Sequence, residues 1–332
     1  MSSWTQEGQL MDELAVGTLI ASTLRVSTPL ILCALAATLS ERSGVIDLGL
    51  EGKMLACAFA AGATAAVSGS MAAALLVAIA VGIALSMLHG YACVSHRGDQ
   101  VVMGMAITMT AAGLTVVLGI AWFHQGGQTP ALPDAVRFGP WFEGAARTLR
   151  EWPFAGPLIG YALLGHNVMV YGALLLVPVV WWLLFRTRFG LRLRAAGENP
   201  AMVDAAGVSI LALRYQALAL NGMLCALAGS YLVLAQNPSF IPHMTAGRGY
   251  MALAAMIFGK WHPVGALLAC LLFGFLDASA IRLQGAPLPL IGAVPVQAIQ
   301  ALPYVLTVVL LAGFIGRSRA PRALGVPYVK ER

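Results

Sequence analysis

The chain has 332 residues, of which 59% are apolar and only 10% are charged, against about 25% charged residues in an average soluble domain. Its mean hydropathy is +0.80, and so little charge cannot cover the surface of a soluble protein of this length. These values exclude a soluble domain, a disordered chain and a collagen-like chain. They predict an all-α polytopic membrane protein, in which 36 glycines let helices approach one another closely.

Nine apolar stretches, within a range of eight to ten, are expected to form the membrane part, since a spanning helix needs about 20 residues. The seventh is too short to cross alone, and the second begins in a glycine-rich stretch that is expected to be partly non-helical. Residues 1–13 carry Glu7, Asp12 and Glu13 and do not resemble a signal peptide, which opens with positive charge. The predicted spans are 14–39, 45–68, 71–95, 100–122, 168–186, 208–235, 247–260, 262–281 and 295–315.

The net charge of +6 indicates orientation, because Lys and Arg collect beside a few predicted span ends. Basic residues mark the cytoplasmic side of a membrane protein. Nine alternating spans then place the N-terminus and a 123–167 loop outside, and a 187–207 loop and a 316–332 tail in the cytoplasm. No nucleic-acid partner is needed to explain the charge. The basic residues on the cytoplasmic side are Arg97, Arg186, Arg188, Arg192, Arg194, Lys260, Arg317, Arg319, Arg322, Lys330 and Arg332.

Residues 41–53 place five charges and three glycines between two apolar stretches. Glycine costs about 1 kcal/mol relative to alanine inside a helix, so the segment does not fit a plain helix. One interpretation is a broken helix at a transport pathway or gate. The other is a cytoplasmic turn in which Glu41 and Arg42 are solvated. The candidate gate residues are Gly44, Asp47, Gly49, Glu51 and Gly52.

Residues 190–207 contain the signals of a two-turn helix over 200–206. Asn199 suits the N-cap, Pro200 suits the first helical position, and Gly207 suits the left-handed residue after the last turn. A helix this short is marginal by itself, so it must dock, either on its own protein's rim or in a partner protein. Met202 and Val203 are its candidate apolar contacts.

Residues 247–263 form a short apolar stretch with glycine or charge at each end, which is typical of interrupted helices at transport sites and equally of a packed core helix. Polar or aromatic pathway candidates are Asn221, Phe240, Tyr250, Gln297 and Gln300, although helix packing explains each as well. The chain has no phosphate-binding loop and no zinc or nucleophile motif. All five cysteines lie in apolar stretches without metal spacing. We therefore expect no catalytic residue, metal or cofactor.

Four ordered motifs resemble the permease subunits of bacterial ABC importers for nucleosides and simple sugars, within the set that includes ribose and branched-chain amino acid permeases. The early motif ERSGVxNxGLEGMML corresponds to residues 41–55, with Asp47 for the usual Asn and Lys53 for an apolar residue. GLRLRAxGENPxAAxxAG corresponds to 190–207 and GRGYxALAAxIFGxWxPxGAL to 247–267. Residues 323–331 resemble the family's C-terminus. The similarity runs from about residue 24 onward.

The resemblance implies a single permease domain over 1–332, with a fold related to the vitamin B12 importer type, in the bacterial inner membrane. It implies three protein partners: an ABC ATPase subunit that hydrolyses ATP, a second and longer permease, and a solute-binding lipoprotein of the basic-membrane type. The chain itself is then a non-catalytic subunit through which nucleosides or simple sugars pass. The residues implied to contact the ATPase are Glu198, Asn199, Pro200, Ala201, Met202, Val203 and Asp204.

Two alternatives remain open at the level of sequence. An ATP-independent carrier or channel for a small polar solute would need buried titratable groups, for which Asp277 is the clearest candidate. An intramembrane enzyme would need a catalytic set that the chain does not display.

Overall fold

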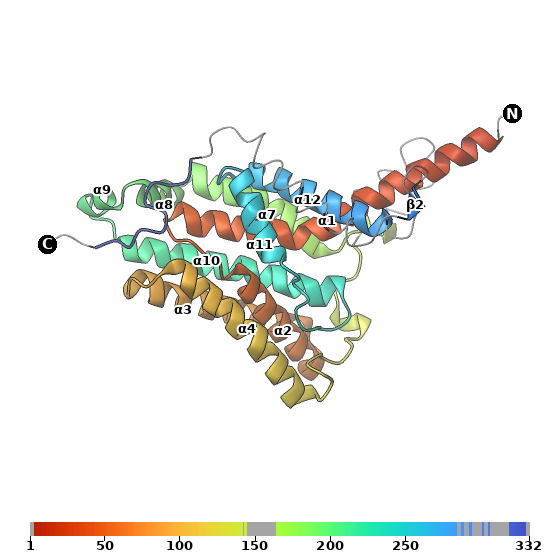
Figure 1. Ribbon diagram of the computed structural model, residues 1–332, viewed down its shortest axis with the longest axis horizontal. Helices are drawn as coiled ribbons and strands as arrows, with labels where there is room; N and C mark the ends of the chain where they lie inside the picture. Colours follow the sequence, from red (N-terminus) through yellow and green to blue (C-terminus); the bar gives the residue numbers. More distant parts are fainter. Residues whose placement is uncertain are drawn as a thin grey trace.

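The computed structural model describes residues 3–141, 143–144, 164–283, 287–288, 292–293, 301, 305 and 319–329. The described part is an elongated helical bundle whose chain ends lie at opposite ends of the long axis (Figure 1). Seven helical segments among these residues are long and apolar enough to cross a membrane. They coincide with seven of the nine predicted spans and confirm a polytopic, all-helical protein.

The helices follow one another with short connections. The α-helices are α1 (Ser3–Arg42), α2 (Leu50–Ser68), α3 (Met71–Gly90), α4 (Gln100–Phe123), α7 (Val168–Arg186), α8 (Arg188–Glu198), α9 (Pro200–Ala205), α10 (Ile210–Tyr231), α11 (Arg248–Phe258) and α12 (Pro263–Leu283). Two π-helical turns, η1 (Tyr91–Ser95) and η3 (Leu232–Gln236), extend α3 and α10, and η2 (Asp134–Val136) is a 3-10 turn. Strands β1 (Pro287–Leu288) and β2 (Gly292–Ala293) pair antiparallel.

Helix α1 forms the centre of the bundle. Its residues 30–37 are apolar on every side, and each is at most 1% exposed. A helix that is apolar all round must be covered on all sides, and α1 packs against α7, α10, α11 and α12. Figure 1 shows it running through the middle of the bundle.

Two helices are shorter than the stretches 45–68 and 247–260 predicted for them, for physical reasons visible in the sequence. Helix α2 begins only at Leu50, because the glycine-bearing residues 43–49 that precede it are not helical. Helix α11 has 11 residues, too few to cross a bilayer by itself. Both agree with the expectations for the second and seventh stretches. The ninth predicted span, 295–315, lies outside the described residues apart from positions 301 and 305.

Glycines set the closest helix contacts. At the crossing of α3 and α10, Gly82 and Gly222 lie so close that a Cβ on either would collide with the carbonyl oxygen of the other. At the crossing of α2 and α10, Gly229 lies in the same way against the Met54 carbonyl. Small residues at such crossings allow backbone-to-backbone packing. Helices α2, α3 and α10 therefore form a tightly packed group.

Candidate functional site

Helix α9 is the short helix predicted from its caps. Asn199 Oδ1 accepts a hydrogen bond from the Met202 amide at 3.2 Å, and Pro200 occupies the first turn. Gly207 has φ +79°, and its amide donates to the Asp204 carbonyl at 2.8 Å. The predicted helix over 200–206 is confirmed to within one residue. It lies at one extreme end of the bundle, beside α8 (Figure 1).

The two apolar side chains of α9 face in opposite directions. Val203 is 8% exposed and packs with Ala196, Ile210 and Leu213 of the adjoining helices. Met202 is 70% exposed. One side of α9 therefore docks on its own protein, as the first interpretation expects, and the side that carries Met202 is exposed. Docking in a partner protein stays a prediction. Of the pair, Met202 alone presents an accessible apolar contact.

Residues 41–53 are buried rather than solvated. Glu41 is 3% exposed, and Asp47 and Lys53 are fully buried. Trp261 Nε1 donates to Glu41 Oε2 at 2.6 Å, while Arg42 Nε donates to the Trp261 carbonyl at 2.9 Å. The interpretation as a solvated turn is therefore wrong for Glu41, and residues 43–49, hereafter the α1–α2 linker, run inside the protein.

Residues 41–53 and 247–263 meet at Glu51. Its two carboxylate oxygens accept hydrogen bonds from the amides of Gly247 at 2.8 Å and Gly249 at 2.6 Å. Gly249 has no room for a side chain, since a Cβ would lie 2.6 Å from the Glu51 backbone. The free amides at the start of a helix favour an anion, so Glu51 caps α11 from another helix.

Beyond α11, burial lowers the pKa of His262, and nearby Arg42 lowers it further.

A buried ion pair joins the α1–α2 linker to α2. Lys53 Nζ lies 2.6 Å from Asp47 Oδ2, and both side chains are 0% exposed. These are the two positions at which the early motif departs from its usual residues, so the two departures compensate each other. His89 Nδ1 lies 4.0 Å from Asp47 Oδ1, and His89 Nε2 contacts the Ile46 carbonyl at 3.1 Å.

Asn221 extends this ion pair into a polar centre between four helices. Its Oδ1 accepts from Lys53 Nζ at 3.3 Å and from Ser86 Oγ at 3.2 Å. Its Nδ2 donates to the Ala36 carbonyl at 3.1 Å and to Ser40 Oγ at 3.3 Å. The side chain is fully buried, so in this conformation Asn221 serves helix packing.

The remaining pathway candidates are dispersed. Phe240 is fully buried and packs edge-to-face on Phe59, with ring centroids 5.2 Å apart. Tyr250 is 38% exposed on α11, and its hydroxyl contacts Met105 Sδ at 3.9 Å. Gln297 and Gln300 lie outside the described residues.

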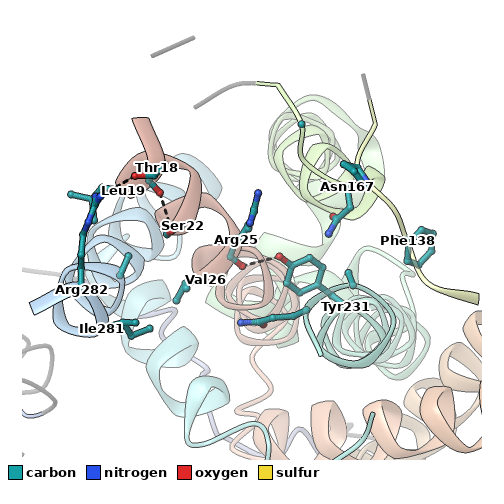
Figure 2. Close-up of a pocket in the computed structure, with 15 residues that line it drawn as sticks. Thr18, Leu19, Ser22, Arg25, Val26, Phe138, Asn167, Tyr231, Ile281 and Arg282 are labelled. Carbon is teal, nitrogen blue, oxygen red and sulfur yellow. Dashed lines mark hydrogen bonds between the residues drawn. The ribbon is translucent and has the colours of Figure 1, made fainter. Parts of the chain in front are cut away.

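A cavity of about 730 Å³ opens at the end of the bundle away from α9. Figure 2 shows Arg25 of α1 and Asn167, at the start of α7, on opposite sides of it, with the Tyr231 hydroxyl donating to the Arg25 carbonyl at 3.0 Å. Among the described residues, the Arg25 guanidinium has no hydrogen bond or ion pair. The lining residues are Thr18, Leu19, Ser22, Arg25, Val26, Phe138, Pro140, Gly165, Asn167, Tyr231, Ala235, Gln236, Ala278, Ile281 and Arg282.

Sequence reasoning missed two arginines, and a signal existed for both. Arg25 is the only charged residue in 14–39, and Arg214 is the only one in 208–235. A lone charge inside an apolar span indicates a function or a specific partner. Arg25 lines the cavity, and Arg214 is buried beneath the α1–α2 linker. Within the described ranges, no group of three or more His, Cys, Asp or Glu side chains is placed to hold a metal ion.

Comparison with known proteins identifies the family. Residues 19–313 match the family described as the branched-chain amino acid transport system permease component. The chain belongs to this permease family. The match includes the segments at 41–53, 190–207 and 247–263 described above.

Relatives of this permease are subunits of ABC transporters. It is 36% identical to the guanosine ABC transporter permease NupQ of Bacillus subtilis, over 94% of this chain and 96% of that protein. It is also 36% identical to the nucleoside ABC transporter permease NupC of Lactococcus lactis, over 95% and 97% of the two chains. A Haloferax volcanii permease, TsgC13, whose name links it to glucose, is 34% identical over 93% and 94%.

One solved structure resembles the permease less closely. It is described as an inward-facing ABC transporter of the metal-chelate type, with a TM-score of 0.46 and 16% identity over 89% of this chain and 85% of that one. That similarity is too low to transfer a conformation. The family assignment itself supports a multi-pass transport subunit over an ATP-independent carrier or an intramembrane enzyme.

Proposed function

We propose that this permease is the pathway-forming subunit of an ATP-driven importer for nucleosides or related simple sugars. The observation that carries the proposal is the helix α9, whose Met202 side chain is exposed at one end of the helical bundle. The relatives at 36% identity support the solute class, since their names give guanosine and nucleosides. ATP hydrolysis then belongs to a separate ATPase subunit, and residues 198–204 form its contact through the exposed side of α9.

The proposed orientation places α9 and the tail in the cytoplasm and the N-terminus outside. The cavity at Arg25 and Tyr231 then faces outward, where a solute-binding lipoprotein delivers solute. The Arg25 guanidinium, which has no hydrogen-bond partner in the described part of the chain, and the polar lining suit a polyhydroxylated solute, because such groups supply hydrogen bonds to a ligand. A second, longer permease completes the pathway, to which Asn221, Phe240, Tyr250, Gln297 and Gln300 remain candidate contributors in other conformations.

The gate is proposed to lie at the α1–α2 linker. Irregular backbone inside a bundle is tolerated where protein surrounds it or where it lines a cavity, and Gly44, Asp47 and Gly49 occupy such a position. The other two gate candidates, Glu51 and Gly52, follow in the first turn of α2. Movement of α9 by the ATPase would open or close the pathway there. This is a coupling free energy shared by two distant sites.

Uptake by the reconstituted complex tests this proposal. Proteoliposomes with the permease, its partner ATPase, the second permease and the binding lipoprotein should accumulate labelled guanosine when ATP is supplied. A matched complex with a catalytically inactive ATPase should not accumulate it. Unlabelled nucleosides and sugars added as competitors would rank the solute classes. Equal uptake with the active and the inactive ATPase would contradict the proposal.

A further inference from the structure

We infer that the described C-terminal residues 319–329, hereafter the tail strap, connect α9 mechanically to the α1–α2 linker, with Arg214 and Tyr328 as positioning residues for ATP-driven transport. The inference rests on the proposed function, in which α9 receives the ATPase. It adds a route by which movement of α9 reaches the buried polar centre. The route is built from hydrogen bonds that the strap makes to α8, to the linker and to α9, and from an arginine where the strap crosses the linker.

The strap is hydrogen-bonded to two different segments through its backbone. The Ala323 amide donates to the Gly197 carbonyl of α8 at 2.8 Å, and the Gly325 amide donates to the Gly44 carbonyl of the linker at 3.1 Å. Gly325 adopts φ +75°, which a residue with a side chain adopts only at a cost. The strap therefore connects α8, the helix that precedes α9 in the chain, to the linker.

At the junction beneath the strap, two glycines bring backbone close against backbone. A Cβ on Gly197 would collide with the Arg42 carbonyl oxygen, and a Cβ on Gly44 would lie 3.1 Å from the Ala323 carbonyl oxygen. Gly44 also has φ +89°. Close-packed interfaces switch between discrete arrangements instead of deforming gradually. A shift of α8 is accordingly passed to the linker backbone.

Arg214 holds the linker and the strap together from below. The side chain is 1% exposed, with Nε donating to the Ser43 carbonyl at 3.3 Å and Nη2 to the Val326 carbonyl at 3.4 Å. Within the described residues, no carboxylate lies within ion-pair distance of it. Burying a guanidinium costs free energy, and its rigid fork of donors here joins the linker to the strap.

Tyr328 completes the route at α9. Its hydroxyl donates to Asp204 Oδ2 at 3.0 Å, and its ring packs on the apolar cluster that contains Val203. Movement of α9 thus reaches the strap through Tyr328, the linker through Gly325 and Arg214, and the Asp47–Lys53 pair at the linker's end. If the strap were only a cover that stabilises the bundle, its loss would lower stability without separating α9 from the linker.

Hydrogen exchange on the permease–ATPase complex distinguishes these roles. The complex is compared with and without a non-hydrolysable ATP analogue, for the wild type, Arg214→Gln, Arg214→Lys and Tyr328→Phe. Val329→Ala is the matched control, since Val329 is 52% exposed beside Tyr328. In the wild type and the control, the nucleotide should alter the hydrogen-exchange rates both at α9 and at residues 43–49. In Arg214→Gln and Tyr328→Phe, the effect of nucleotide on α9 should persist, while its effect on residues 43–49 should be lost or reduced.

Transport supplies the second readout. The solute moved per ATP hydrolysed should fall about fivefold in Tyr328→Phe, which corresponds to one hydrogen bond of about 1 kcal/mol. Arg214→Lys should be closer to the wild type than Arg214→Gln, because lysine still donates to one carbonyl. If 43–49 responds to nucleotide equally in all variants and the ratio stays unchanged, the strap is only a cover. If the wild type binds no ATPase, the proposed function itself fails, whatever the strap does.

Discussion

Two segments concentrate the few charges of this chain, and the fold treats them in opposite ways. At 41–53, Asp47 and Lys53 are fully buried and paired, and Glu51 caps a helix from inside the bundle. At 188–204, Arg188, Arg192 and Glu198 are exposed. Similar composition therefore serves two purposes. Buried charges fix the arrangement of helices, whereas exposed charges are available to orient the protein and meet partners, so substitutions in the two segments should differ in kind.

The largest effect on stability is expected at the buried ion pair. Lys53→Met should lower the free energy of unfolding by about 3–5 kcal/mol, because it leaves the Asp47 carboxylate buried without its partner. The double variant Lys53→Met with Asp47→Asn should recover more than half of that loss, since it leaves no charge uncompensated. Thermal unfolding in detergent measures both.

The control for this cycle comes from the exposed segment. Glu198→Gln removes a charge from the solvated side and should change stability by less than about 0.5 kcal/mol. The single variant Asp47→Asn completes the cycle. If the double variant loses as much stability as Lys53→Met and Asp47→Asn together, the pairing of Asp47 with Lys53 is contradicted.

Two glycines allow the buried and the exposed segment to be compared through their backbones. Gly44 and Gly207 both have positive φ, +89° and +79°, so alanine at either costs about 1 kcal/mol of strain. At Gly44 the added Cβ would also lie 3.1 Å from both Ala323 O and Arg214 Nη2, whereas at Gly207 it meets nothing within 4 Å. Gly44→Ala should therefore destabilise about 1–3 kcal/mol more than Gly207→Ala. Equal shifts in melting temperature would show that the linker is not tightly packed.

A smaller effect is expected at the N-cap of α9. Asn199→Ala removes the hydrogen bond to the Met202 amide and should cost about 1 kcal/mol. Because α9 also docks through Val203, the loss should be local, visible as faster hydrogen exchange at 200–206 with exchange in α10 unchanged. Asn199→Asp, which retains a capping oxygen, should keep the wild-type exchange rates.

The smallest effect on stability is expected at Met202. Met202→Asp places a charge on a side chain that is 70% exposed and should leave the unfolding temperature within about 1 °C, while lowering the recovery of the ATPase with the permease several-fold. Val203→Asp buries a carboxylate instead and should destabilise the protein, so Met202→Asp alone is the informative variant. Undiminished co-purification would remove the exposed side of α9 from the proposed interface.

Much of this fold could be predicted from the sequence because its signals are local. Seven runs of apolar residues specify seven spans, and the cap residues Asn199, Pro200 and Gly207 mark α9 to within one residue. The late start of α2 follows from its glycines. In each case the residues that decide the structure are neighbours in the chain.

The partners of polar residues could not be predicted, because they come from distant segments. Asn221 contacts Lys53 and Ser86, which lie 168 and 135 residues away in the sequence. No sequence pattern predicts these contacts. Which side of α9 faces outward depends on the apolar surface of α8 and α10. The cavity at Arg25 is assembled from five separate segments, although the lone arginine in an apolar stretch was a usable signal.

The glycine crossings of α10 limit which parts of the bundle can move. Gly82 on α3 and Gly222 on α10 touch backbone to backbone, and seven residues further along, Gly229 touches α2 at Met54. Sliding any of these helices along another by a fraction of a turn would drive a side chain into a space that admits none. The three helices should therefore travel as one rigid body during a transport cycle. Rearrangement is left to the boundaries of that body, and the α1–α2 linker lies on one of them.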